Sequence, residues 1–155
     1  MKTTCSIRKM QESDIKDLSR GFISQGWPSR EEILTRYFKE QESGEREVLI
    51  ADLTSAVVGY ITILPDAKQG PFAGMAPELS DFNVFEAFQN QGIGNLLIEE
   101  AEKRVKLFSD KVTLCRFALR LWSCPEIVHQ TRLYSRWFRR LVSKPTFGNE
   151  CHYSK

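Results

Sequence analysis

The sequence predicts an α/β domain in which helices cover both faces of a mixed central sheet. Patterns typical of strands and helices follow one another in the order β-α-α-β-β-β-α-β, which favours this class. Length and composition agree, because 155 residues with 41% hydrophobic side chains suffice for one good core and are short for two.

Two helices are expected in the first third of the chain. Ser13 is the expected cap of a helix that carries Ile15 and Leu18 toward the core. Ser29 and Glu32 fit a capping box at the start of the next helix. That helix would bury one apolar stripe, made of Ile33, Leu34, Tyr37 and Phe38.

Strand and helix patterns continue beyond Gly44, the residue expected to end the second helix. The composition becomes rich in strand-forming residues from Glu47 onward. Residues 65–77 contain several turn-forming residues and predict a loop. A long amphipathic helix is expected from Asn95 to about Phe108. Its core-facing stripe would recur every four residues, at Ile93, Leu97, Ala101 and Val105.

The turn QNQGIG at residues 89–94 separates the apolar run 79–85 from this last helix. Glycines let backbone N–H groups converge, and a helix start adds unpaired donors and the positive end of its dipole. The turn therefore suits a phosphate group, with a plain strand–helix turn as the alternative. A Walker loop needs a Lys where Asn95 stands, and the dinucleotide fingerprint needs a third glycine where Leu97 stands.

A third phosphate-binding pattern, Gln/Arg-x-x-Gly-x-Gly/Ala, is matched at every fixed position by Gln89, Gly92 and Gly94. With this turn the chain resembles the GCN5-related N-acetyltransferase (GNAT) superfamily, bacterial type, whose members bind the pyrophosphate of acetyl-CoA there. The resemblance covers about residues 5–114. Residues 7–15 resemble the family's first strand and helix, 47–52 and 57–63 its second and third strands, and 77–84 its fourth strand.

The resemblance implies an acetyl-CoA-dependent N-acetyltransferase that acts on an amine of a small molecule or a protein. In the family the fourth strand splays from the fifth, and pantetheine pairs with exposed backbone in the gap. Gln89 stands where the family more often has Arg, so weaker CoA binding is expected. The residues expected at the cofactor are Phe82, Asn83, Val84 and Phe85 for pantetheine, and Gln89, Asn90, Gln91, Gly92, Ile93, Gly94 and Asn95 for the pyrophosphate.

The resemblance also suggests a catalytic base. Glu78 stands at the start of the fourth strand, where many relatives carry a carboxylate that deprotonates the amine through water. Asp81 and Glu86 are the alternatives, and a solvated carboxylate at a strand end is the non-catalytic interpretation. Tyr134 mimics the tyrosine that protonates the leaving thiolate in relatives, but its surroundings lack the Gly-Tyr that follows there. His129 and His152 have no partner pattern, and no metal is expected.

The chain changes character near residue 115. Residues 1–114 carry 14 Lys/Arg against 18 Asp/Glu, whereas residues 115–155 carry 8 against 2. We therefore separate an acetyl-CoA-binding domain, 1–114, from a basic segment, 115–155, that replaces the family's last strands and helix. A basic tail with aromatic residues is compatible with nucleic-acid binding or with an ordinary basic helix around 131–142.

A reading-frame shift explains this change better. Trp122 and Trp137 have the single codon TGG, which read one position later begins GG and encodes Gly. Codons exist for residues 115–140 whose shifted frame spells VGLHYGYGAAQKLYIKRGYIPDGSG. This string resembles the missing family segment, so the alternative function is a catalytically impaired CoA-binding remnant or a protein that binds partners through its basic tail. We do not expect nucleic acid as a partner.

Location and assembly follow from general features. No run approaches the roughly 20 apolar residues of a membrane span, and the N-terminus lacks the apolar stretch of a signal peptide. The four cysteines show no metal-binding or disulfide spacing, which favours reduced thiols. We expect a cytoplasmic protein without membrane contact, either a monomer or a homodimer.

Overall fold

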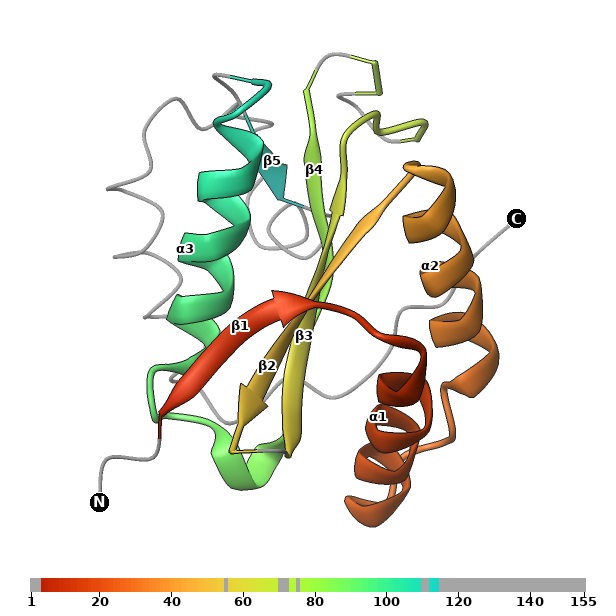
Figure 1. The fold of residues 1–155 in the computed structure, drawn as a ribbon, viewed down its shortest axis with the longest axis vertical. Helices are drawn as coiled ribbons and strands as arrows, with labels where there is room; N and C mark the ends of the chain where they lie inside the picture. The colour runs from red at the N-terminus through yellow and green to blue at the C-terminus, as the bar shows by residue number, and fades with distance from the viewer. Residues whose placement is uncertain (1–3, 55, 70–72, 75, 110–111, 115–155) are drawn as a thin grey trace, which may run out of the picture.

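The computed structural model describes residues 4–54, 56–69, 73–74, 76–109 and 112–114, which contain a five-stranded sheet of order β1-β2-β3-β4-β5 (Figure 1). Strands β1 to β4 are antiparallel neighbours, whereas β5 is parallel to β4. The predicted mixed sheet is confirmed. The strands are β1 (Cys5–Lys9), β2 (Glu47–Leu53), β3 (Val57–Leu64), β4 (Glu78–Val84) and β5 (Thr113–Leu114).

Helices lie on both faces of this sheet, as predicted (Figure 1). Helices α1 (Glu12–Ser24) and α2 (Glu31–Ser43) cover one face, and α3 (Ile93–Val105) covers the other. A short 3-10 helix, η1 (Glu86–Phe88), lies between β4 and α3. Because α3 connects β4 to its parallel neighbour β5, it provides the crossover that parallel strands require.

The alternation of side chains along β2 divides the core into two clusters. Leu49 and Ala51 pack with α3, whereas Val48 and Ile50 pack with α1 and α2. All four side chains are fully buried. A strand with apolar residues on both sides is what a sheet covered on both faces needs.

The start of α1 differs from the prediction. Gln11, not Ser13, is the N-cap, and Asp14 completes a capping box by accepting a hydrogen bond from the Gln11 N–H at 2.7 Å. Asp14 is also held by Arg8 of β1 at 2.7 Å. This ion pair between β1 and α1 favours Asp14 as the capping carboxylate, and Ser13 lies inside the first turn of the helix.

The start of α2 also differs. Arg30 is the N-cap, and its side chain makes no capping hydrogen bond. The Ser29 hydroxyl shares a hydrogen bond of 2.6 Å with Ser19 of α1, and accepts only a long one, 3.4 Å, from the Glu31 N–H. Ser29 therefore links two helices rather than closing a capping box. Gly44 ends α2 in the left-handed conformation, as predicted.

Helix α3 begins at Ile93, two residues before the predicted Asn95, and ends at Val105. Its predicted stripe is confirmed, because Leu97 and Ala101 are fully buried, while Ile93 and Val105 are nearly so. Within the described part of 65–77, the chain forms bends and turns without a helix or strand. Among the described residues, no helix is both long enough and apolar enough to span a bilayer.

Candidate cofactor and acceptor site

Among the described residues, the end of β4 next to the turn at 89–94 has one edge without a strand neighbour, which we call its open edge. Within the described residues, β5 pairs with β4 only at Glu78 and Leu79, through Thr113 and Leu114. The backbone from Ser80 onward therefore has no described strand neighbour on that side. Such an edge can pair with an extended ligand.

A β-bulge lies in the middle of β4. Ser80 is opposite Thr62 and Asn83 is opposite Tyr60, so two residues of β4, Asp81 and Phe82, stand opposite one residue of β3. Asp81 has a positive φ of 42°. Bulges raise the local twist and leave a residue outside the ladder. The sequence pattern did not reveal this feature.

The turn after β4 presents the start of α3 without a side-chain cap. Asn90 and Gly92 adopt left-handed conformations, with φ of 60° and 84°. Gly92 is the N-cap of α3 and, having no side chain, leaves the first N–H groups of the helix without a capping oxygen. An anion at this point would accept those hydrogen bonds and meet the positive end of the helix dipole.

The predicted strand and turn residues lie close together. A Cβ on Gly94 would come within 3.0 Å of the Phe82 ring, so glycine allows the first turn of α3 to approach β4. The residues from Gln89 to Gly92 are exposed, whereas Gly94 and Asn95 are half-buried. Backbone groups of β4 and of the turn thus face the same region.

The side chain of Gln89 points back to the strand. Its Nε2 donates a hydrogen bond of 2.9 Å to the carbonyl oxygen of Val84, the last residue of β4. Gln91, two positions later, is exposed and donates a longer bond of 3.3 Å to the Ala87 carbonyl. The two glutamine side chains of the turn therefore have different surroundings.

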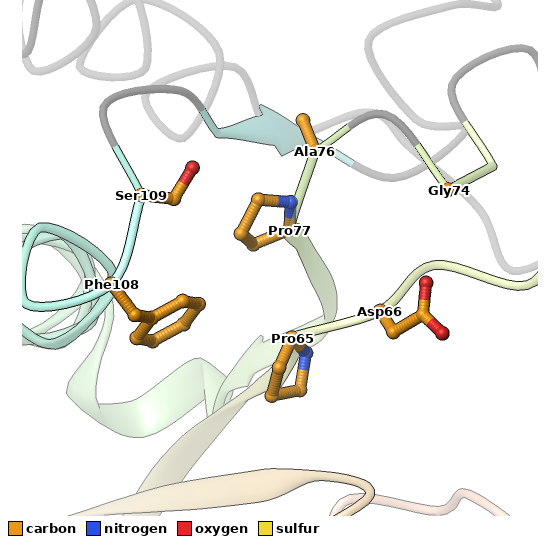
Figure 2. A pocket seen from close by; sticks show the side chains of 7 residues that line it. All are labelled: Pro65, Asp66, Gly74, Ala76, Pro77, Phe108 and Ser109. Atoms are coloured by element: carbon orange, nitrogen blue, oxygen red, sulfur yellow. The ribbon is translucent and has the colours of Figure 1, made fainter.

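Glu78 lies at the opposite end of β4 from the turn. It is half-buried between Leu64 of β3 and Thr113 of β5. Among the described residues, its carboxylate has no ion-pair or hydrogen-bond partner. A hollow of about 180 Å³ opens beside this end of the strand (Figure 2). Its walls are formed by Pro65, Asp66, Gly74, Ala76, Pro77, Phe108 and Ser109.

The two alternative candidates for the catalytic base lie in the middle of β4 and in η1. Asp81 accepts hydrogen bonds of 3.1 and 2.7 Å from the guanidinium of Arg30 and one of 2.8 Å from the Tyr37 hydroxyl. Glu86 is exposed in η1, at the turn end of β4. Asp81 is therefore already engaged by two partners, and Glu86 lies beside the candidate phosphate site.

Asp81 belongs to a polar cluster between β4 and the α1–α2 layer, which we call the Arg30–Asp81 cluster; it consists of Arg30, Tyr37, Tyr60 and Asp81. The Arg30 guanidinium also donates to the Tyr60 hydroxyl at 2.7 Å. Burial raises the pKa of both tyrosine hydroxyls above its ordinary value, with the nearby Asp81 carboxylate adding to the effect. Both hydroxyls therefore stay protonated and can donate or accept hydrogen bonds.

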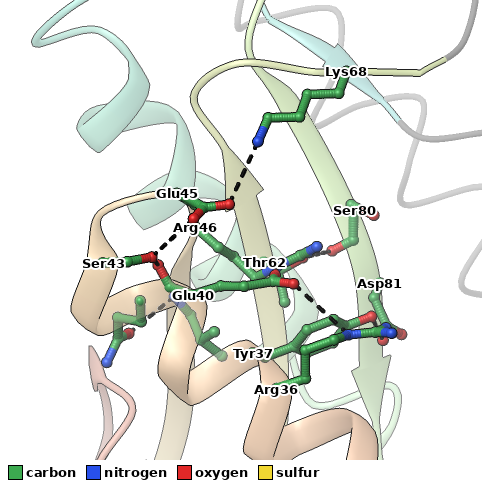
Figure 3. Close-up of polar contacts among 12 residues, drawn as sticks. Arg36, Tyr37, Glu40, Ser43, Glu45, Arg46, Thr62, Lys68, Ser80 and Asp81 are labelled. Atoms are coloured by element: carbon green, nitrogen blue, oxygen red, sulfur yellow. Dashed lines mark hydrogen bonds and ion pairs between the residues drawn. The ribbon is translucent and has the colours of Figure 1, made fainter.

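A second set of polar contacts supports this cluster from α2 (Figure 3). The Arg46 guanidinium stacks 4.1 Å from the centroid of the Tyr37 ring and pairs with Glu40 at 2.6 Å. It also donates to the Thr62 hydroxyl at 2.8 Å, and that hydroxyl donates to the Ser80 carbonyl at 2.7 Å. These contacts tie α2 and β3 to β4 immediately before the bulge.

Sequence reasoning missed most of the Arg30–Asp81 cluster. Tyr37 was predicted only as part of a buried apolar stripe. No sequence pattern indicated that Arg30 or Tyr60 belongs to a polar cluster. The charge of Asp81 inside an apolar run was the one available clue. Tyr134, His129 and His152 lie outside the described residues. Among the described residues, no group of three His, Cys, Asp or Glu side chains could hold a metal ion.

Solved structures share this fold at low sequence identity. An aminoglycoside 6′-N-acetyltransferase from Acinetobacter haemolyticus is 16% identical, with a TM-score of 0.60 and 97% of each chain covered. A ribosomal-protein-alanine N-acetyltransferase from Brucella melitensis biovar Abortus 2308 is 12% identical, with a TM-score of 0.59, covering 98% of this chain and 100% of that one.

A third similar structure was determined with acetyl-CoA bound. It is a GNAT family acetyltransferase from Brucella melitensis, 18% identical, with a TM-score of 0.53, covering 77% of this chain and 82% of that one. No curated protein sequence matches the chain. The family described as "Acetyltransferase (GNAT) family" matches residues 12–124. This match covers most of the chain, which therefore belongs to the GNAT family of N-acetyltransferases.

Proposed function

We propose that this protein transfers the acetyl group of acetyl-CoA to an amine of a small molecule or a protein. The observation that carries the proposal is the start of α3, which has no side-chain cap, beside the edge of β4 that is open in the described part of the chain. One element offers N–H donors for phosphates, and the other offers a strand edge for the pantetheine amides. The family membership agrees with this pairing.

The cofactor would be held mainly by backbone. In this proposal the N–H groups from Gln91 to Asn95 bind the pyrophosphate, and the backbone from Phe82 to Phe85 binds pantetheine. Acetyl-CoA supplies an activated thioester. The protein has to hold that thioester, exclude competing water and remove a proton from the attacking amine.

Glu78 is our proposed general base. Its support is a half-buried carboxylate at a strand end, without a partner among the described residues. Asp81 is less suitable, because Arg30 and Tyr37 already occupy its oxygens. A base acting through a positioned water typically contributes about 10²- to 10⁴-fold to the rate. Glu78→Gln should therefore lower kcat within this range while acetyl-CoA affinity stays unchanged; unchanged turnover would exclude the role.

The acceptor is an amine whose identity we leave open. The similar structures include enzymes named for an aminoglycoside and for an alanine of a ribosomal protein, so both acceptor classes belong in the test. Calorimetry with acetyl-CoA comes first, followed by thiol-release assays over a panel of aminoglycosides, polyamines and peptide N-termini. Binding followed by turnover supports the proposal, whereas absence of acetyl-CoA binding would overturn it.

A second candidate function is a CoA-binding protein without turnover. The change of character after residue 114 favours it, because the segment that carries the leaving-group tyrosine in relatives is replaced here by 115–155. We propose a shifted reading frame as the cause. The nucleotide sequence between the codons for Lys111 and Arg116 decides this, since codons incompatible with the shifted spelling would exclude it. Salt-sensitive retention on DNA would instead support a nucleic-acid role for the tail.

A further inference from the structure

Gln89 occupies a carbonyl on the edge of β4 that faces the proposed cofactor. Phe85 donates its N–H to the Val58 carbonyl at 2.9 Å, while Val84 stands opposite Gly59. In an antiparallel ladder this pattern makes Val84 and Gly59 a non-hydrogen-bonded pair. The N–H and carbonyl of Val84 therefore point away from β3, toward the side on which β5 lies.

Among the described residues, no strand pairs with the Val84 carbonyl on that side. Within the described residues, β5 pairs with β4 only as far as Leu79. Val84 is 7% exposed, so water has limited access to its backbone. A buried carbonyl without a partner costs about 1–3 kcal/mol. The Gln89 amide satisfies this carbonyl at 2.9 Å.

This hydrogen bond links the end of β4 to the turn at 89–94, which we call the proposed phosphate turn. Between Val84 and Gln89, the Phe88 N–H donates to the Phe85 carbonyl at 2.8 Å, and the Gln89 N–H donates to the Glu86 carbonyl at 3.3 Å. Gln89 is thus held by its backbone and by its side chain. The next residue, Asn90, begins the left-handed turn that leads to the N-cap at Gly92.

We propose that Gln89 is a positioning residue, whose side chain fixes the phosphate turn to the end of β4 and does not contact the phosphates. It acts through the backbone, by setting the direction of the N–H groups at the start of α3. This inference rests on the proposed function, since it concerns the acetyl-CoA site. From the sequence, we expected Gln89, standing where the family more often has Arg, to weaken CoA binding only through the lost charge. The proposal replaces this expectation.

The test compares three variants by calorimetry with CoA, at a temperature where each is fully folded. Gln89→Met keeps the length of the side chain but removes its donor, and should weaken CoA binding about five- to tenfold. Gln89→Arg keeps N–H donors at this position, which Gln89→Met lacks, and should bind CoA with wild-type affinity or more tightly. Gln69→Met, at an exposed glutamine of the loop after β3, is the matched control outside the proposed site and should change affinity less than twofold.

Three outcomes would overturn the proposal. Equal losses in the Gln89→Met and Gln69→Met variants would mean that the Val84 bond has no special role. A CoA affinity of Gln89→Arg as low as that of Gln89→Met would also mean that the Val84 bond has no special role. Tighter binding of pantetheine to Gln89→Met would mean that the side chain blocks the strand edge rather than organising the turn.

A ligand-free measurement separates this inference from the proposed function. If the wild-type protein does not bind CoA, the proposed function has failed. Amide hydrogen exchange of residues 90–95 then still tests Gln89 without any ligand. Faster exchange in Gln89→Met than in Gln69→Met supports the positioning role, and equal exchange contradicts it.

Discussion

Helix α3 covers its face of the sheet mainly with apolar side chains, whereas the face covered by α1 and α2 combines an apolar cluster with charges and hydroxyls. On the α3 side, Leu97 packs against Ile61 and other fully buried aliphatic residues. On the α1–α2 side, Arg30 and Asp81 meet beside the buried Tyr60. Apolar packing provides stability without directional demands, while hydrogen bonds specify where particular atoms lie.

This difference suggests that the two faces have different roles. The α3 face supports the sheet and the start of α3, where the proposed phosphate turn ends. The Arg30–Asp81 cluster fixes the β4 bulge, which lies three residues from the proposed base Glu78. Changes on the α3 face should therefore mainly affect folding, and changes in the cluster should also affect the acceptor side of the site.

The largest effect is expected for Leu97→Ala on the α3 face. Leu97 is fully buried, so the substitution leaves a cavity and should lower the free energy of unfolding by about 2–5 kcal/mol. Leu96→Ala is the control, because this neighbour is 39% exposed and should change stability by about 0.5 kcal/mol or less. Urea unfolding measures both, and similar losses would contradict the assigned packing of α3.

Asp81→Asn should have the next largest effect. The substitution leaves the partly buried Arg30 guanidinium without its anion and should cost about 1–3 kcal/mol. Asp17→Asn, in an exposed pair with Arg20, is the control and should cost about 0.5 kcal/mol or less. If Arg30→Met in the same chain does not reduce the loss, the ion pair is not its cause.

The buried carboxylate of Glu102 makes the α3 face sensitive to pH. Burial raises its pKa from 4.5 to about 7, with Lys106 opposing and Glu99 adding to the rise. Because the folded state holds this proton more tightly than the unfolded state, stability should fall as pH rises from 4.5 to 7. Glu102→Gln should flatten this decline and stabilise the protein at pH 8 by about 1 kcal/mol.

Thermal unfolding at pH 5 and pH 8 checks this expectation. The difference between the two melting temperatures should shrink in Glu102→Gln, because glutamine does not titrate between these pH values. One side-chain oxygen of Glu102 is buried without a hydrogen-bond partner among the described residues, which agrees with its raised pKa. Glu42→Gln, an exposed change on α2, should leave that difference nearly unaltered. Equal slopes in the wild type and in Glu102→Gln would exclude Glu102 as the titrating group.

The smallest effect is expected for Tyr37→Phe in the Arg30–Asp81 cluster. It removes one hydrogen bond of 2.8 Å to Asp81 and keeps the ring that stacks under Arg46, so the loss should be about 1 kcal/mol. If the cluster positions the bulge, the KM for the acceptor should rise while the KM for acetyl-CoA stays constant. A parallel rise of both constants would indicate a general loss of structure.

Local patterns were sufficient to predict the elements of this fold. The four-residue recurrence that begins at Ile93 identified the buried side of α3, and Gly44 marked the end of α2, since both signals depend only on nearby residues. The helix starts were wrong where a side-chain contact with another element decides. Asp14 caps α1 and is held by Arg8 of β1, and helix-cap patterns do not include that contact.

The candidate site shows the same limit. The glycines of the turn are readable in the sequence because left-handed backbone and close approach favour glycine. The Arg30–Asp81 pair joins residues 51 positions apart, and its geometry depends on a bulge that only the sheet register defines. The target of the Gln89 side chain likewise depends on which side of β4 the Val84 carbonyl faces, a property of strand pairing rather than composition.

The length of strand β4 sets the distance between the two ends of the proposed site. Its seven residues separate the phosphate turn at one end from Glu78 at the other, a length of about 20 Å at the usual rise of a strand. In the proposed function, an acyl donor anchored by its phosphates has to bridge that length to bring its reactive carbon to Glu78. Donors with shortened arms should then bind at the turn but not reach the carboxylate, so we expect the length of β4 to limit which thioesters react.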